Sequence, residues 1–265
     1  MRRSIGLVGV VLAVAMGAGL AAAQTSQVIN GTGLPVMPSN AVRDGVTPWN
    51  FGVLAQGGVG VTEDRSNFRF FSAGVRAGKV LTATAGSGLL RGNFEYGVEV
   101  FPLWQSYTPV MQRQSCVPIA AGSTTVRCSG YFNTGGTYTG VSITPAVLRW
   151  NFAGWGRVSP WVQGAGGVVW TNHKYPGFGG PPGYPPGTIL ANPSGNGYTY
   201  NSASADTSVW NFTPQFGVGM HWFLRPKRSV DFGANAIHVS SASLGDRNPG
   251  VNASVQFTVG YSWWK

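Results

Sequence analysis

Eight segments after residue 48 have the length and patterning of membrane β-strands, and this repetition limits the fold more than any other feature. They lie at about 49–60, 67–78, 92–105, 140–153, 158–172, 208–224, 228–242 and 251–264. In the last segment, apolar residues such as Phe257, Val259 and Tyr261 alternate with polar residues such as Gln256 and Thr258. Alternation over about ten residues is a weak signal once, but its repetition is typical of a β-barrel. Segments 67–78 and 158–172 alternate poorly and are assigned from their length and glycine content.

The composition favours a membrane barrel over a soluble domain. Charged residues make up only 10% of the chain, against about 25% in soluble domains, yet no apolar run after residue 23 is long enough for a helical span. The 40 glycines and 33 aromatic residues (14 Phe, 10 Trp, 9 Tyr) suit a barrel with aromatic girdles. We therefore expect an all-β fold: an eight-stranded antiparallel transmembrane β-barrel of the outer-membrane type over residues 49–265.

The connections between the segments predict which end of the barrel is external. Those at 106–139 and 173–207 are long, whereas those around 154–157 and 225–227 are short. With a periplasmic N-terminus, the long connections fall outside and the short ones inside, as in bacterial outer-membrane barrels. The connection at 79–91 is longer than this pattern predicts.

An eight-stranded barrel is narrow, and side chains fill its interior. Glu95 and Glu99 alternate with apolar neighbours and should point inward, as should Arg149 on the next segment. Because an unpaired buried charge is costly, we expect these charges to pair across the lumen. His221 is expected to be a hydrogen-bonded lumen residue.

The N-terminus has the layout of a secretory signal peptide. Arg2 and Arg3 precede an apolar stretch that ends in Ala21-Ala22-Ala23. The alternative is a membrane anchor, but the stretch is shorter than the ~20 residues needed to span a bilayer. We predict a signal peptide at 1–23, a polar lead at 24–48, and the outer membrane of a Gram-negative bacterium as the location.

Export bears on the cysteines and on the charge. Cys116 and Cys128 are the only cysteines, they lack a metal-type spacing, and an exported protein is expected to join them in a disulfide. The formal net charge is +10. The sequence has no basic cluster or stacking motif for nucleic acid, so anionic headgroups or lipid A phosphates are the more natural partners.

A histidine and a serine end the seventh segment on one face. His238 and Ser240 lie two residues apart, with backbones roughly 6.6 Å apart on a strand, which lets an imidazole reach a hydroxyl. They continue the parity of Val230, Phe232 and Ala234, so both should face the lipid near the external rim. Either the two residues are ordinary polar side chains at the membrane interface, beyond the hydrocarbon region, or Ser240 is a nucleophile.

The surrounding residues resemble a known signature. His238-Val239-Ser240-Ser241-Ala242-Ser243-Leu244, followed by Asn248-Pro249-Gly250-Val251-Asn252, is similar to the motif of the PagL-type lipid A 3-O-deacylases. The similarity covers about fifteen residues, with a looser one over the whole barrel.

The resemblance implies an esterase that needs no metal or other cofactor. Ser240 would attack an ester of lipid A in the outer leaflet, and His238 would be its general base. The residue after the serine, together with backbone N–H groups, would stabilise the oxyanion.

Two positions depart from the family pattern. Ser241 stands where the family has an oxyanion-stabilising Asn, and Asn252 stands where it has the Glu that orients the histidine. Asp246 is the nearest acid and is predicted to orient His238 instead. The prediction is therefore a lipid A esterase whose biogenesis uses the outer-membrane assembly machinery. The alternative is a non-enzymatic relative serving envelope integrity or adhesion.

Overall fold

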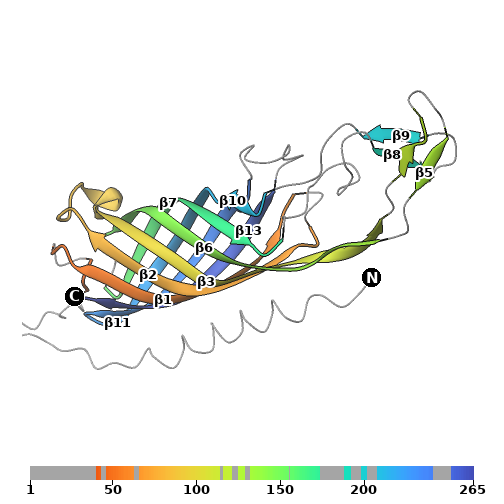
Figure 1. Ribbon diagram of the computed structural model, residues 1–265. Helices are drawn as coiled ribbons and strands as arrows, with labels where there is room; N and C mark the ends of the chain where they lie inside the picture. Colours follow the sequence, from red (N-terminus) through yellow and green to blue (C-terminus); the bar gives the residue numbers. More distant parts are fainter. Residues whose placement is uncertain are drawn as a thin grey trace, which may run out of the picture. The chain divides into compact units, whose positions relative to one another are not determined.

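A closed antiparallel barrel of eight strands forms the body of the protein (Figure 1). The computed structural model describes residues 40–42, 46–62, 66–113, 116–120, 125–128, 132–154, 156–173, 188–191, 198–201, 208–240 and 252–265. The barrel strands are β1 (Trp49–Gly60), β2 (Arg69–Val80), β3 (Gly92–Arg113), β6 (Phe132–Phe152), β7 (Val158–Thr171), β10 (Trp210–Phe212) with β11 (Gln215–Arg225), β12 (Arg228–His238) and β13 (Ala253–Trp264).

Each strand pairs with the next along the chain, and β1 pairs with β13 to close the ring. The short strand β10 and the strand β11 both pair with β7, so they occupy one position in the ring. Each of the eight predicted segments overlaps one of these positions. The predicted eight-stranded antiparallel barrel is therefore confirmed.

One connection differs from the prediction. Strands β3 and β6 remain paired as far as Arg113 and Phe132, so much of 106–139 is a two-stranded ribbon rather than a loop. The long connection after β2 contains a bridge between Ala85 and Gly92 and the 3-10 turn η2 (Gly88–Leu90). Two small hairpins complete the described elements: β4 (Cys116–Pro118) with β5 (Val126–Cys128), and β8 (Thr188–Ala191) with β9 (Tyr198–Asn201). Among the described residues, no helix is long and apolar enough to cross a membrane.

Alternate side chains divide the barrel into an apolar outer face and a polar lumen. The outer face exposes large apolar side chains from seven of the eight strand positions, among them Phe51, Phe71, Leu148, Phe216 and Phe257. The opposite parity buries polar residues, among them Gln56, Ser72, Thr144, Asn235 and Gln256. An apolar exterior with a polar interior is the pattern of an outer-membrane barrel.

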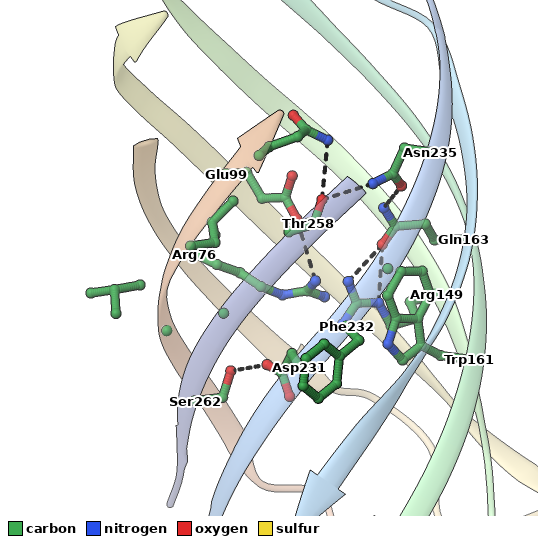
Figure 2. A pocket seen from close by; sticks show the side chains of 16 residues that line it. Arg76, Glu99, Arg149, Trp161, Gln163, Asp231, Phe232, Asn235, Thr258 and Ser262 are labelled. Carbon is green, nitrogen blue, oxygen red and sulfur yellow. Dashed lines mark hydrogen bonds and ion pairs between the residues drawn. The ribbon is translucent and has the colours of Figure 1, made fainter. Parts of the chain in front are cut away.

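An ion-pair network lies in the lumen, and Figure 2 shows its pair of Arg76 with Glu99. Arg76 of β2 is 2.9 Å from Glu95 and 3.3 Å from Glu99, both on β3. Asn151 of β6 donates to the second oxygen of Glu95 at 2.8 Å. Pairing of the glutamates within the lumen is confirmed, but their partner is Arg76 rather than Arg149.

Arg149 points into the lumen as its parity predicted, but its partners are not the glutamates. Its guanidinium donates to the side-chain oxygen of Gln163 at 2.6 and 3.0 Å and lies 4.1 Å from the centre of the Trp161 ring. The ring has room because Gly219 and Gly233 face it, where a Cβ atom would lie 2.4 and 2.8 Å from its atoms. Stacking on tryptophan stabilises the cation without a carboxylate partner.

His221 is fully buried in the lumen beside Asp231. Its Nδ1 is 2.7 Å from the Asp231 carboxylate, which also accepts hydrogen bonds from the hydroxyls of Ser229 and Ser262. His221 is thus a hydrogen-bonded lumen residue, as predicted.

Apolar clusters occupy both ends of the lumen. One cluster lies at the end of the barrel where β1 begins, and it consists of Ala41, Val42, Val80, Phe223 and Trp264. At the other end lie Phe68, Phe70, Trp104, Tyr138, Val169 and Val239. The cavity between them holds only about 30 Å³, room for one or a few water molecules. The described lumen is filled rather than an open pore.

Replacing Arg76 should destabilise the barrel strongly. Arg76→Ala leaves Glu95 and Glu99 buried without their cation, and breaking such a pair costs about 3–5 kcal/mol. Arg69→Ala, on the same strand but exposed, should change the free energy of unfolding by less than about 0.5 kcal/mol. Urea unfolding in lipid vesicles, followed by heat-modifiable gel migration, measures both. Equal stability of the two variants would contradict a structural role for the network.

Candidate functional site

His238 and Ser240 lie together at one end of β12. His238 is the last residue of the strand, where it pairs with Ala253 of β13, and its amide donates to the carbonyl of Pro214 at 3.0 Å. Ser240 forms a β-bridge with Phe212 of β10. The amide nitrogen of Phe212 lies 2.6 Å from the carbonyl oxygen of Ser240, and that of Ser240 lies 2.9 Å from the carbonyl oxygen of Phe212. These main-chain bonds extend the strand geometry as far as Ser240.

The alternation of β12 continues through these residues. Asn235, Ile237 and Val239 are buried on the lumen side, whereas His238 and Ser240 are half-buried on the outer side. The histidine and the serine therefore share the outward-facing surface of the barrel, next to the exposed Phe212.

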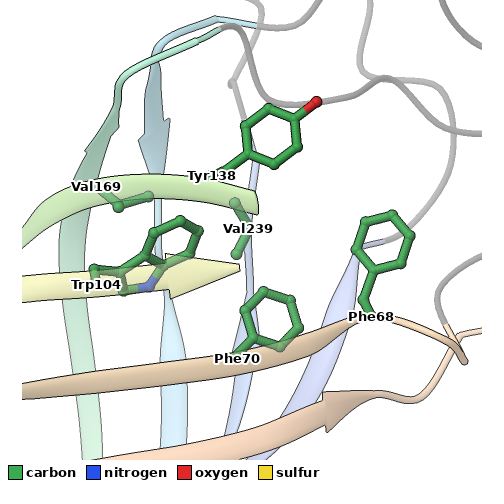
Figure 3. Close-up of a cluster of buried hydrophobic side chains, with 6 residues drawn as sticks. All are labelled: Phe68, Phe70, Trp104, Tyr138, Val169 and Val239. Carbon is green, nitrogen blue, oxygen red and sulfur yellow. The ribbon is translucent and has the colours of Figure 1, made fainter. Parts of the chain in front are cut away.

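Val239 anchors this strand end from within (Figure 3). Its side chain is 3% exposed and belongs to the apolar cluster with Phe68, Phe70, Trp104, Tyr138 and Val169. A packed residue between two outward-facing polar residues limits their movement, which a catalytic pair needs.

The carbonyl oxygen of Asn252 fixes the His238 ring. It accepts a hydrogen bond from the amide of Val239 at 2.9 Å and lies 3.0 Å from Nδ1 of His238. A carbonyl only accepts, so the nitrogen facing it carries the proton. In the neutral ring, Nε2 is then the unprotonated nitrogen, which is the one a general base uses.

The side chain of Asn252 does not make this contact. It is only 1% exposed, and within the described part of the chain neither atom of its amide has a hydrogen-bond partner. The main chain, not the side chain, thus faces His238 at the position where the family resemblance implies a glutamate.

The remaining predicted site residues lie in the segment after Ser240, and the two cysteines lie in the β4–β5 hairpin. Ser241, Asp246 and the Asn248-Pro249-Gly250 turn lie outside the described residues. Cys116 and Cys128 are directly opposite each other in the β4–β5 hairpin register. In the described ranges, no group of three or more His, Cys, Asp or Glu could hold a metal ion.

Comparison with known proteins identifies the family. The family model of the lipid A 3-O-deacylase (PagL) matches residues 95–262, well over half of the chain. The chain belongs to this family. The match runs through β12 and most of β13, and so includes His238, Ser240 and Asn252.

The chain is also similar to three solved structures at low sequence identity. The outer membrane enzyme PagL is 14% identical, with 80% of this chain and 98% of that chain covered and a TM-score of 0.41. Neisserial surface protein A is 13% identical, with coverage of 81% and 96% and a TM-score of 0.41. The N-terminal barrel domain of Pseudomonas aeruginosa OprF is 9% identical, with coverage of 82% and 100% and a TM-score of 0.36. No curated protein matches the sequence.

Family membership confirms the resemblance found in the sequence. The protein is a lipid A deacylase or a related barrel, and its location is the outer membrane of a Gram-negative bacterium. Sequence reasoning missed the Asn252 carbonyl, because a main-chain acceptor has no residue-type signature.

The tautomer of His238 can be measured directly. In ¹⁵N NMR spectra of the histidine-labelled protein in micelles at mildly alkaline pH, we expect Nδ1 of His238 to be protonated and Nε2 to be unprotonated. Asn252→Ala should leave this pattern unchanged, because the carbonyl remains. His238→Gln identifies the signal among the three histidines. A protonated Nε2 in the wild type would contradict the assignment.

Proposed function

We propose that this protein is a serine esterase that removes an ester-linked acyl chain from lipid A. The observation that carries the proposal is the outward-facing pair His238 and Ser240, within the PagL family match, with Nδ1 of His238 held by a carbonyl. A site on the outer wall suits a substrate that lies in the membrane beside the barrel.

The proposed reaction follows the chemistry of serine esterases. The Ser240 hydroxyl oxygen attacks the ester carbonyl carbon while Nε2 of His238 takes its proton. The tetrahedral intermediate then expels the sugar oxygen, which receives that proton from His238. Nε2 of His238 then deprotonates a water molecule, whose oxygen attacks the carbonyl carbon of the acyl-serine. The Ser240 oxygen leaves with the proton returned by His238, and the fatty acid is released.

The Asn252 carbonyl is proposed to orient His238 in place of the family's glutamate. In serine proteases, replacing the orienting Asp by Asn costs about 10⁴ in rate, because the histidine adopts the wrong tautomer. A carbonyl accepts the Nδ1 proton and so keeps the productive tautomer. It supplies no full negative charge to stabilise the imidazolium, so we expect a functional but slower enzyme.

The oxyanion must be stabilised from the segment that follows the nucleophile. The amide of Ser240 already donates to Phe212, so it cannot also bind the oxyanion. We propose that the amide and hydroxyl of Ser241 serve this role, the hydroxyl in place of the family's Asn.

Apolar side chains next to Ser240 offer a surface for acyl chains. Trp210, Phe212 and Phe216 are 53%, 39% and 58% exposed on the same outward parity. Phe212 lies directly opposite Ser240 across the bridge. We propose that acyl chains of lipid A pack on this surface while the ester lies at Ser240.

Three further features remain predictions of the sequence. These are the signal peptide at 1–23, the disulfide between Cys116 and Cys128, and the use of the outer-membrane assembly machinery. The register of the β4–β5 hairpin supports the disulfide, because it pairs the two cysteines directly.

Deacylation should depend on Ser240 and His238. Expression of the wild type in a Gram-negative host should yield lipid A lighter by one acyl chain. Ser240→Ala and His238→Ala should lower this activity by on the order of 10⁴ to 10⁶. Mass spectrometry of extracted lipid A measures the change, and Ser87→Ala, an exposed serine in the connection after β2, is the control.

An unchanged lipid A spectrum from a folded, membrane-inserted wild type would contradict the proposal. It would favour the non-enzymatic barrel, for which the missing glutamate is the supporting observation.

Substitutions at Asn252 and Asp246 distinguish the two proposed orienting groups. If the Asn252 carbonyl orients His238, Asn252→Ala and Asp246→Asn should both retain activity near that of the wild type. Initial deacylation rates on purified lipid A in mixed micelles measure this. A loss on the order of 10⁴ in Asp246→Asn would assign the role to Asp246 instead. The same loss in Asn252→Ala would show that the side chain is required.

A further inference from the structure

Basic residues surround the end of the barrel opposite His238 and Ser240. Lys79 and Arg91 flank the connection after β2, Arg157 precedes β7, and the turn between β11 and β12 contributes Arg225, Lys227 and Arg228. We call these six residues the basic rim. The sequence showed no basic cluster of this extent, because closure of the barrel brings distant connections to one end.

The acidic side chains that the structure describes are engaged inside the barrel. The three acidic side chains that the structure describes, Glu95, Glu99 and Asp231, all lie in the lumen network. Arg225 and Arg228 are also direct cross-strand partners, and both are exposed. Like charges placed directly opposite repel each other, so an anion at this turn would stabilise it.

Aromatic residues place the rim at a membrane interface. The guanidinium of Arg228 lies 5.7 Å from the centre of the Trp263 ring, and Nζ of Lys79 lies 5.4 Å from that of Trp49. Trp49 is 49% exposed and stacks on the outward-facing Phe51. Exposed tryptophans beside cations are typical of the depth at which lipid headgroups lie.

The length of β12 separates the rim from the site by one bilayer. The strand runs from Arg228 to His238, roughly 33 Å at 3.3 Å per residue. A tilt of about 40° reduces this to about 25 Å, which is the height of the apolar band of such barrels. The rim and the His238–Ser240 pair thus lie at opposite interfaces.

We propose that the basic rim binds the phosphates of anionic phospholipids in the leaflet opposite the one that contains the site. Phospholipid fits better than a soluble anion because the cations adjoin outward-facing aromatic rings. Binding at this end would hold the barrel at a fixed depth and keep His238 and Ser240 level with the other leaflet. The proposal does not depend on esterase activity.

Lipid retention tests the proposal. The full-length barrel is reconstituted in mixed vesicles of phosphatidylcholine and phosphatidylglycerol. Every variant receives the same lipid mixture and the same lipid-to-protein ratio. The protein is then extracted gently for native mass spectrometry. We expect the wild type to retain phosphatidylglycerol preferentially. Combined Arg225→Gln, Lys227→Gln and Arg228→Gln should reduce that preference by at least about fivefold, because each cation near an anionic surface contributes measurably. Raising the salt concentration should weaken binding to the wild type.

A control variant removes two cations that lie outside the rim. Arg69→Gln with Arg127→Gln changes two exposed residues outside the rim and should leave the preference intact. Heat-modifiable migration verifies that each variant is folded. Equal retention by the rim variant, or an equal loss in the control, would overturn the proposal. Rim-dependent binding to isolated peptidoglycan without any lipid preference would also overturn it.

Discussion

Hydrogen bonding of the backbone in a hydrocarbon solvent is the constraint on which this structure depends. Lipid offers no partner for a free amide or carbonyl, so a membrane sheet must close on itself. The pairing of β1 with β13 achieves this. Closure then fixes everything else: one set of alternate side chains faces lipid, and the other must fill a narrow lumen. The interior charges, the end clusters and the position of the site all follow from that division.

Closure of the barrel brings polar side chains from different strands into contact in the lumen. Arg76 neutralises two glutamates on the neighbouring strand, and Asp231 binds His221 and two serines. These interactions link neighbouring strands of the barrel wall through their side chains. A rigid wall is what a site on the outer surface needs, because catalytic side chains must be held in place by the residues packed around them. Val239, packed between them into the lumen cluster, links the rigid interior to the reactive exterior.

The proposed site therefore combines side chains from one strand with a main-chain atom from the next. The Asn252 carbonyl is positioned by the amide of Val239 and faces His238 with its second lone pair. This arrangement provides a physical route by which a family member without the orienting glutamate keeps the required tautomer. The proposed basic rim would act at the other interface, where phosphate binding would set the depth of the barrel and hence the level of the site.

The sequence by itself determined the strand count, the parity of the clearly alternating strands and the outward direction of His238 and Ser240, because these depend on a period of two that is local to each strand. It also supplied the family motif. It assigned Arg149 as the partner of the glutamates, since the poor alternation of β2 concealed Arg76. Only the tertiary structure decided the lumen pairing, the contact between His238 and the Asn252 carbonyl, and the gathering of cations at one end. Each of these joins residues on different strands or connections, and their proximity depends on the register and closure of the barrel.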